Sequence, residues 1–326
     1  MQKVQIIPKN RKRHHRTHST MFLKKREFWG GRARGLAPPE PPPPPDEASA
    51  AATEASSELA SSLENRRLYR EVTLALRTAL RDATAEFSFL RLRGLRNLLK
   101  SLRSIADSDD AIRLFRQSQS LHELQVIPVL FNNSLRQLKD EPVMRVDHIF
   151  GVEPMKITSP ATDSEVALAL RVLEGCCLLH KESTVLAHEH DAIKVLVNIL
   201  STRGTLEQGA CLDALISLML DSVANQMEFE ECYGIEKIAE LVKDEEGDDN
   251  IRLKCGEFLL LLAGQVKRRE RAPLATIHED IRKLLGEKCA SLVWAVGQFG
   301  STLAPEDRQA TLQIQARRVL ESLTLH

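Results

Sequence analysis

The sequence predicts an all-α fold, and two observations support this prediction. The apolar side chains are mostly Leu, Ile, Val and Ala, while aromatic residues make up only 4% of the chain. This composition favours helices packed on helices over a sheet-rich fold, whose strands are enriched in β-branched and aromatic residues. Apolar residues also recur at helical spacing, as at Leu68, Val72, Leu76, Ala79 and Leu80, which fall on one helical face.

The same helical pattern returns along the chain at a nearly fixed interval. The stretches beginning at Leu170, Cys211 and Cys255 read LRVLEGCCLL, CLDALISLML and CGEFLLLLAG, offset by 41 and 44 residues. Two further stretches, AIKVLVNIL at Ala192 and GIEKIAELV at Gly234, are offset by 42. Periods of about 40 to 47 residues are typical of armadillo and HEAT solenoids, whose units bury their apolar faces against one another. We therefore expect an armadillo- or HEAT-like helical solenoid.

The N-terminal extension, residues 1–65, differs in composition from the rest of the chain. Residues 1–35 carry 11 Lys and Arg against one acid, and residues 36–65 carry six acids and no base. Seven of the 14 prolines lie between Pro38 and Pro45. Such a segment forms polyproline II and flexible linker, because it has too little apolar area to offset the entropy of ordering. We expect residues 1–65 to be disordered and residues 66–326 to form the repeat domain.

Within the repeat domain, the periodicity predicts the helices in order. The first begins near Arg66, the second runs from about Leu92 to Ile105, and the third covers roughly residues 120–138. Periodicity then stops between residues 139 and 163, and a loop of that length is usually functional or mobile. Thr162 and Glu165 form a capping box that opens a helix through Leu179. Helices at about residues 275–326 are expected to cap the C-terminal end.

The six cysteines are predicted to be reduced core residues. They lie singly or as one adjacent pair, Cys176 and Cys177, mostly in apolar helical stretches, and a chain of 326 residues does not need disulfide staples. The apolar run from Phe258 to Ala263 is far shorter than the ~18 residues a membrane span requires. No secretory leader stands out. We expect a cytoplasmic protein, with the nucleus as a further location.

No catalytic or metal-binding motif is present in the sequence. The chain contains no GxxxxGK[ST], GxGxxG, HExxH or GxSxG stretch, so we expect no enzyme activity, cofactor or small-molecule substrate. His180, His188 and His190 lie close together, but His188 and His190 point apart on a helix, whereas metal ligands must converge. We interpret this segment as a polar connection with solvated histidines and expect no metal.

The basic start of the chain leaves several interpretations open. KNRKRHHR at residues 9–16 fits a nuclear localisation signal, an organellar transit peptide, contact with RNA or membrane, or a stretch without function upstream of a start at Met21. GGRARG at residues 30–35 resembles a single RGG fragment. Residues 66–326 hold 34 bases and 38 acids, which argues against nucleic acid as the main partner, because phosphate binding needs a concentrated cationic face. We expect no membrane partner either.

A binding groove is predicted from the repeat phase. Importin-type armadillo solenoids bind extended basic peptides through a ladder of Trp and Asn. Here Arg171, Asp213 and Glu257 stand at the Trp positions. The Asn positions are taken by Gly175, Ser217 and Leu261. The ladder is absent, so import-cargo binding is not expected. Arg171, Asp213 and Glu257 are candidate partner-binding groove residues, and an ordinary solvated helix face is the alternative.

Several stretches of the chain resemble a known family. They are GLRNLLKSLRSIADSDDAIRLFRQSQSLHELQVIPVLFNNSL, the FGVEP loop, LRVLEGCCLLHKES, and GIEKIAELVKDEEGDDNIRLKCGEFLLLLAG. Together they are similar to the plant branch of the cell division control protein fourteen family of the septation initiation network. No cysteine-phosphatase loop is present, which separates the chain from the phosphatase of the same name. The resemblance covers about residues 68–267 and assigns no contact residues.

The resemblance implies a function without catalysis. It points to an armadillo-like regulatory scaffold that binds a germinal-centre-type protein kinase and supports its signalling in cell division and cytokinesis. The alternative is an armadillo-type structural adaptor for the cytoskeleton or for trafficking, without a kinase partner. Neither interpretation predicts nucleic acid or membrane among the partners.

Overall fold

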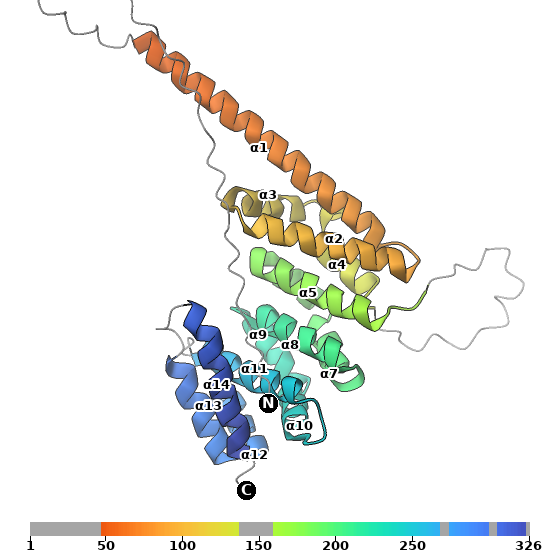
Figure 1. Cartoon of the computed structure of the whole chain (residues 1–326), viewed down its shortest axis with the longest axis vertical. Helices are drawn as coiled ribbons and strands as arrows, with labels where there is room; N and C mark the ends of the chain where they lie inside the picture. The colour runs from red at the N-terminus through yellow and green to blue at the C-terminus, as the bar shows by residue number, and fades with distance from the viewer. Residues whose placement is uncertain (1–46, 137–158, 268–273, 300–304, 324–326) are drawn as a thin grey trace, which may run out of the picture. The chain divides into compact units, whose positions relative to one another are not determined.

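In a computed structural model of the chain, every regular element is a helix within the described residues, 47–136, 159–267, 274–299 and 305–323 (Figure 1). The all-α class is therefore confirmed. By its contacts the chain divides into Met1–Glu54 and Ala55–His326, and the second unit holds the core. Across the described segments, no helix has the length and apolar character that crossing a bilayer requires.

The helices of the first half are α1 (Glu47–Ala83), α2 (Ser88–Ala106), α3 (Asp109–Gln119), the short 3₁₀ helix η1 (His122–Leu124), α4 (Val126–Asn132), α5 (Asp163–Leu179), α6 (Glu182–Glu189) and α7 (Ala192–Thr202). Those of the second half are α8 (Thr205–Met219), α9 (Val223–Glu231), α10 (Gly234–Lys243), α11 (Asp249–Lys267), α12 (Leu274–Leu285), α13 (Glu287–Phe299) and α14 (Pro305–Leu323).

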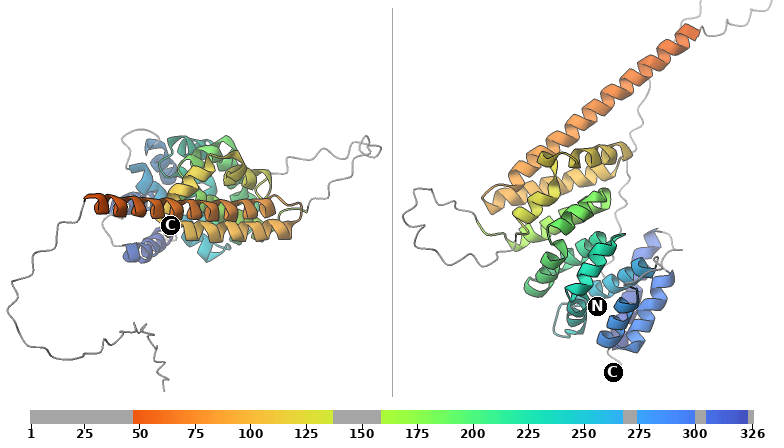
Figure 2. Two further views of the ribbon diagram at one scale, coloured as in Figure 1. Left: turned by 90° about the horizontal axis from the view of Figure 1, so that it is seen from above. Right: turned by 180° about the vertical axis from the view of Figure 1, so that it is seen from behind.

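The helices of the second unit fall into successive groups of three. One group is α6, α7 and α8, and the next is α9, α10 and α11. Every third helix of the series that begins at α2 contacts the next one, so that α2 packs on α5, α5 on α8, α8 on α11 and α11 on α14 (Figures 1 and 2). The three repeated stretches found in the sequence lie on α5, α8 and α11. Each repeat therefore supplies the apolar surface that its neighbour covers.

A left-handed residue marks the same position in two successive groups. Asp191 precedes α7 with φ 54°, and Tyr233 precedes α10 with φ 58°. These two residues are 42 apart, the offset measured for the stretches that follow them. The left-handed conformation is unusual for residues other than Gly. Its recurrence shows that the repeat extends from the apolar pattern to the backbone turn.

The N-terminal boundary differs from the prediction. Helix α1 begins at Glu47, so residues 47–65 are helical rather than disordered; the remainder of the extension, residues 1–46, lies outside the described residues. Side chains from Ser56 to Arg67 are exposed all round, and burial begins only at Leu68. The Ala- and Glu-rich composition supports a helix without packing, since both residues are strong helix formers. Apolar periodicity located the start of burial, not the start of the helix.

The predicted third helix is also wrong in its bounds. The chain forms α3 up to Gln119, then η1, then α4, instead of one helix over residues 120–138. The break is held by the buried Gln119 side chain, which donates to the Leu124 carbonyl at 2.9 Å and accepts from the Val126 amide at 3.0 Å. These bonds satisfy backbone groups that a break in a helix would otherwise leave without partners. Most of the predicted loop, residues 139–158, lies outside the described residues.

The predicted start and end of the helix at 163–179 are confirmed. Thr162 accepts a hydrogen bond from the Glu165 amide, and α5 ends at Leu179. The Glu165 side chain is not used as a reciprocal cap, however. It is fully buried and forms an ion pair with Arg91, whose Nε lies 2.6 Å from Glu165 Oε1. The hydroxyls of Ser88 and Ser134 donate to the same carboxylate at 2.6 and 2.7 Å.

Arg91 also holds the backbone around this carboxylate. Its guanidinium donates to the carbonyl of Glu86 at 2.7 Å, in the turn between α1 and α2. It donates in addition to the carbonyl of Ser159 at 2.8 Å, just before α5. A buried ion pair is tolerated only when its remaining polar atoms are satisfied, and here they are. The pair therefore fixes the starts of α2 and α5 relative to each other.

Close contact between α1 and α2 requires a glycine. A Cβ atom at Gly94 would lie 2.7 Å from the carbonyl oxygen of Ala79 and would also meet the Ala83 backbone. Both atoms belong to α1, and a backbone does not give way as a flexible side chain does. The two helices can thus approach so closely only because residue 94 has no side chain.

Breaking the ion pair between Arg91 and Glu165 should lower the stability of the fold. Arg91→Ala leaves the Glu165 carboxylate buried without its partner, and we expect a loss of about 3–5 kcal/mol in the free energy of unfolding. Arg113→Ala is the matched control, because Arg113 and its partner Asp110 are 58% and 61% exposed and pair at the surface. It should cost at most about 1 kcal/mol. Urea denaturation measures both, and equal losses would contradict the assigned role of Arg91.

Four cysteines on the repeated helices are buried: Cys176, Cys177, Cys211 and Cys255. Burial raises the pKa of the Cys177 and Cys255 thiols to about 12, and it raises the pKa of Cys176 and Cys211 well above the usual value. Because the thiolate is the reactive form, native-state labelling at all four should be slow. Half-buried Cys232 should react first. Mass spectrometry of maleimide adducts checks the order, and fast labelling of Cys211 would contradict this packing.

Candidate partner-binding surface

The three candidate groove residues lie on three consecutively packed helices. Arg171 is on α5, Asp213 on α8 and Glu257 on α11; Arg171 is exposed and the other two are half-buried. The fixed repeat interval brings residues 42 and 44 positions apart to equivalent places on neighbouring helices. Lys254 of α11 joins them, with its Nζ 2.6 Å from Asp213 Oδ2 and 3.3 Å from the Gly209 carbonyl. This bond connects α8 to α11.

Glu174 shares this face with the predicted residues. Burial raises the pKa of its carboxyl above the usual value, and the negative charge of Asp213 raises it further. The positive charges of Arg171 and Lys254 act in the opposite direction. Glu174 therefore lies within electrostatic reach of charged residues on all three helices.

Glu257 resembles Glu174 in its surroundings. Burial is the main reason that its pKa is raised, with Lys254 lowering it and Asp213 raising it. The described residues provide neither Glu174 nor Glu257 with an ion pair, because Lys254 is taken by Asp213. The face thus combines three carboxylates with two cations and has a net negative centre.

Sequence reasoning missed Glu174 and Lys254. A signal was available, since Glu174 follows Arg171 by three residues and Lys254 precedes Glu257 by three, and such neighbours share a helix face. Extending the set of predicted residues by one turn on each helix would have included both.

The positions aligned with the Asn ladder are occupied differently. A Cβ at Gly175 would lie 3.2 Å from the Leu102 side chain, and the buried Ser217 hydroxyl donates to the Ala214 carbonyl at 2.8 Å.

The sequence suggested that all three histidines are solvated, but the structure shows that they are not. His180 is buried, with Nδ1 2.9 Å from Ser183 Oγ and Nε2 3.0 Å from Glu182 Oε2. Its pKa is lowered chiefly by burial. His188 pairs with Glu228 of α9 at 2.8 Å, and the ring of His190 stacks on Phe131. Among the described residues no cluster of His, Cys, Asp or Glu is suited to hold a metal ion.

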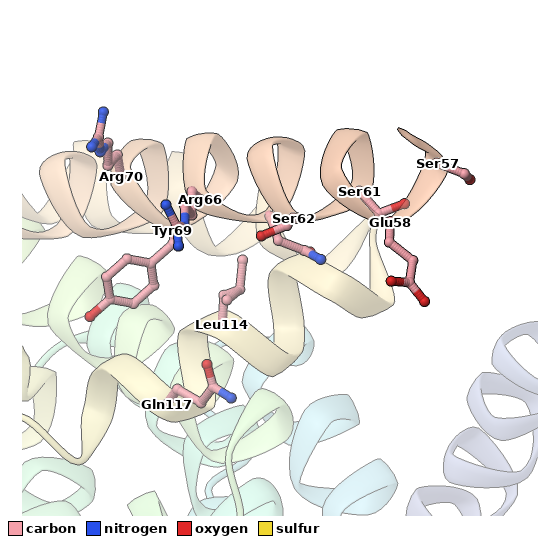
Figure 3. A pocket seen from close by; sticks show the side chains of 10 residues that line it. Ser57, Glu58, Ser61, Ser62, Arg66, Tyr69, Arg70, Leu114 and Gln117 are labelled. Atoms are coloured by element: carbon pink, nitrogen blue, oxygen red, sulfur yellow. The ribbon is translucent and has the colours of Figure 1, made fainter. Parts of the chain in front are cut away.

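A surface cavity of about 640 Å³ lies elsewhere, between α1 and α3. Tyr69 extends from α1, and Leu114 and Gln117 extend from α3, into the gap between these helices, whereas the Arg70 guanidinium points away from α3 (Figure 3). The side of the cavity that α1 forms carries the hydroxyl groups of Ser57, Ser61 and Ser62. None of the candidate groove residues lines this cavity.

Comparison with known families finds one match. Residues 143–281 match the model of the family described as cell division control protein 14, SIN component. The matched range includes all of α5 to α11 and thus every candidate groove residue. Over residues 143–281 the match confirms the family resemblance seen in the sequence.

Comparison with individual proteins adds little. No curated protein matches the chain. Two crystal structures of engineered proteins match at 13% sequence identity and a TM-score of 0.39. One alignment covers 76% of this chain and 96% of the engineered chain, and the other covers 77% and 99%.

The raised pKa of Glu174 gives a pH dependence with a definite sign. A carboxyl that binds its proton more tightly in the folded state adds stability at pH values below its unfolded pKa of about 4.5, and this contribution is lost as pH rises through the folded pKa. Glu174→Gln removes the ionisation, so we expect a higher melting temperature than wild type at pH 7 and little difference at pH 4. Calorimetry at both pH values measures this. A lower melting temperature at pH 7 would contradict it.

Proposed function

We propose that this chain, a member of the cell division control protein 14 family of SIN components, is a non-catalytic regulatory scaffold that binds a protein kinase during cell division. The match over residues 143–281 is the observation that carries the proposal, because it links the repeated helices to cell-division signalling. The partner we propose is a kinase of the germinal-centre type. In this role the chain acts in the cytoplasm, and in the nucleus where the kinase requires it.

The arrangement of helices supports a scaffold. We infer that the three-helix groups form an armadillo- or HEAT-like solenoid, since their third helices pack one on the next from α2 to α14. Solenoids of this kind present an extended surface along these helices, which suits a protein partner better than a small molecule. On this proposal the chain needs no cofactor, metal, nucleic acid or membrane.

The charged face of α5, α8 and α11 is the proposed contact for the kinase. Exposed charges add little to folding but steer association and fix the register of an interface. Arg171, Glu174 and Glu257 are available for this purpose because no ion pair within the described residues occupies them. Asp213 and Lys254 are paired with each other, so they contribute to the interface only as a pair.

The test is a charge reversal that preserves this pair. A variant carrying Arg171→Glu, Glu257→Lys, Asp213→Lys and Lys254→Glu reverses four of the five charges of the face while keeping residues 213 and 254 oppositely charged. We expect its melting temperature to stay within a few degrees of wild type and its affinity for the germinal-centre-type kinase to fall at least tenfold, about 1.4 kcal/mol. Isothermal titration with the purified full-length proteins measures the affinity.

The control exchanges only the internal pair, as Asp213→Lys with Lys254→Glu, and should bind almost as tightly as wild type. Wild-type affinity in the four-residue variant would exclude this face as the kinase contact. Failure of the wild-type protein to bind any kinase of this type, with cytoskeletal or trafficking proteins co-purifying instead, would replace the scaffold proposal with the adaptor interpretation.

A further inference from the structure

Large apolar side chains are exposed at repeat-equivalent positions along one edge of the second unit. Leu178 and Val185 are each 58% exposed, and the residues 42 positions later, Leu220 and Met227, are 43% and 48% exposed. Val223, three residues after Leu220, and Leu261 of α11 are each 42% exposed, and these two lie beside the repeat-equivalent pairs rather than at their positions. We call Leu178, Val185, Leu220, Val223, Met227 and Leu261 the apolar strip.

The strip lies at one edge because α5, α8 and α11 run in the same direction. Arg203, just before α8, bonds to Asp163 at the start of α5 at 3.2 Å, so these two helices begin side by side. The Asp213–Lys254 bond pairs corresponding parts of α8 and α11. The ends of α5 and α8, together with α6 and α9 that follow them, therefore lie along the same edge, and Leu261 of α11 lies about one turn before it.

The regular spacing distinguishes the strip from scattered surface leucines. Single exposed apolar residues are ordinary on protein surfaces, whereas a contiguous exposed apolar patch usually marks an interaction site. Here two consecutive groups expose apolar side chains at the same two positions, one at the end of the third helix and one on the helix that follows. We call each of these two pairs, Leu178 with Val185 and Leu220 with Met227, an apolar step. A partner that lies across both groups meets a similar apolar step on each.

Acidic side chains border these steps. Glu182 and Glu189 stand three and four residues from Val185, on the same exposed face of α6. On α9, half-buried Glu230 and exposed Glu231 follow Met227 by three and four residues. Glu174 and Glu257 each precede a leucine of the strip by one helical turn. Lys181 and Arg116, whose Nε donates to the Leu179 carbonyl, are basic residues beside Leu178, but carboxylates outnumber them along the strip, so basic side chains on a partner complement its border.

We propose that the apolar strip docks an amphipathic helix of the protein partner, with apolar residues on one face and Lys or Arg flanking them. Packed helices are about 8–10 Å apart, which sets the separation of successive steps. A helix advances about 10.5 Å in seven residues, at about 1.5 Å per residue. Apolar residues recurring every seventh position of the docked helix therefore fall on the two successive steps at Leu178 and Leu220.

This inference deepens the proposed function and rests on it, since the docked helix belongs to the kinase partner. It assigns apolar contact to the ends of α5 and α8 and to Leu261 of α11, and charge complementarity to the acidic residues around them. The strip and the charged face then form one surface with two kinds of contact.

A designed peptide tests the chemistry without knowledge of the partner. The probe is a fluorescent helical peptide of about three heptads, with Leu on one face at heptad spacing and Lys on both sides of that face. We expect saturable binding to the full-length chain by fluorescence anisotropy. The same peptide with Glu in place of Lys should bind at least tenfold more weakly.

Two variants of the chain locate the site. Leu178→Ser combined with Leu220→Ser should weaken binding of the Lys peptide at least tenfold, and because both leucines are largely exposed the melting temperature should change little. Leu74→Ser is the matched control, because Leu74 is 66% exposed on α1, outside the strip. This variant should bind the peptide as tightly as wild type.

Wild-type affinity in the double variant overturns the proposal, as does equal binding of the two peptides or no binding of either. If the kinase binds wild type and the double variant equally, the strip is wrong while the scaffold function stands. If no kinase binds but the Lys peptide depends on Leu178 and Leu220, the strip stands and the kinase partner is wrong.

Discussion

The buried ion pair between Arg91 and Glu165 is the constraint on which the N-terminal part of the stack depends. It joins α2 to α5 across a long stretch of chain and absorbs the polar groups of the turns around it. Burying two charges is expensive, and only complete hydrogen bonding compensates for the cost. Apolar packing between these helices fixes distance but tolerates sliding, whereas a bonded carboxylate fixes position. The register of α5 on α2 is therefore set by polar contacts inside an apolar core.

From α5 onward, repeated apolar packing between helices takes the place of a single buried ion pair of this kind. The third helices pack one on another with buried cysteines and leucines, and two hydrogen bonds from Lys254, to Asp213 and to the Gly209 carbonyl, also hold α8 against α11. Because the groups are equivalent, exposed positions of one group recur 42 residues later, as Leu178 and Val185 recur at Leu220 and Met227. The charged face and the apolar strip both result from this repetition, so the interior packing also determines the spacing of the outer surface.

The helical class, the repeat interval and the limits of α5 followed from apolar periodicity and the Thr162 cap. Two kinds of feature did not. Helix α1 starts at Glu47 through local propensity without burial, which periodicity does not report, and the break after Gln119 depends on side-chain bonds to its own backbone. At the candidate site, the interval placed Arg171, Asp213 and Glu257 on adjoining helices. It did not indicate which charges pair, because partner choice depends on side-chain reach.

The hydrogen bonds around Glu165 have a consequence for the chain between α4 and α5. Ser134, before that segment, and Ser159, after it, are both held at the Arg91–Glu165 cluster. Both anchor points are thus part of the folded core. The core itself therefore sets the distance that the chain between these two anchors must span.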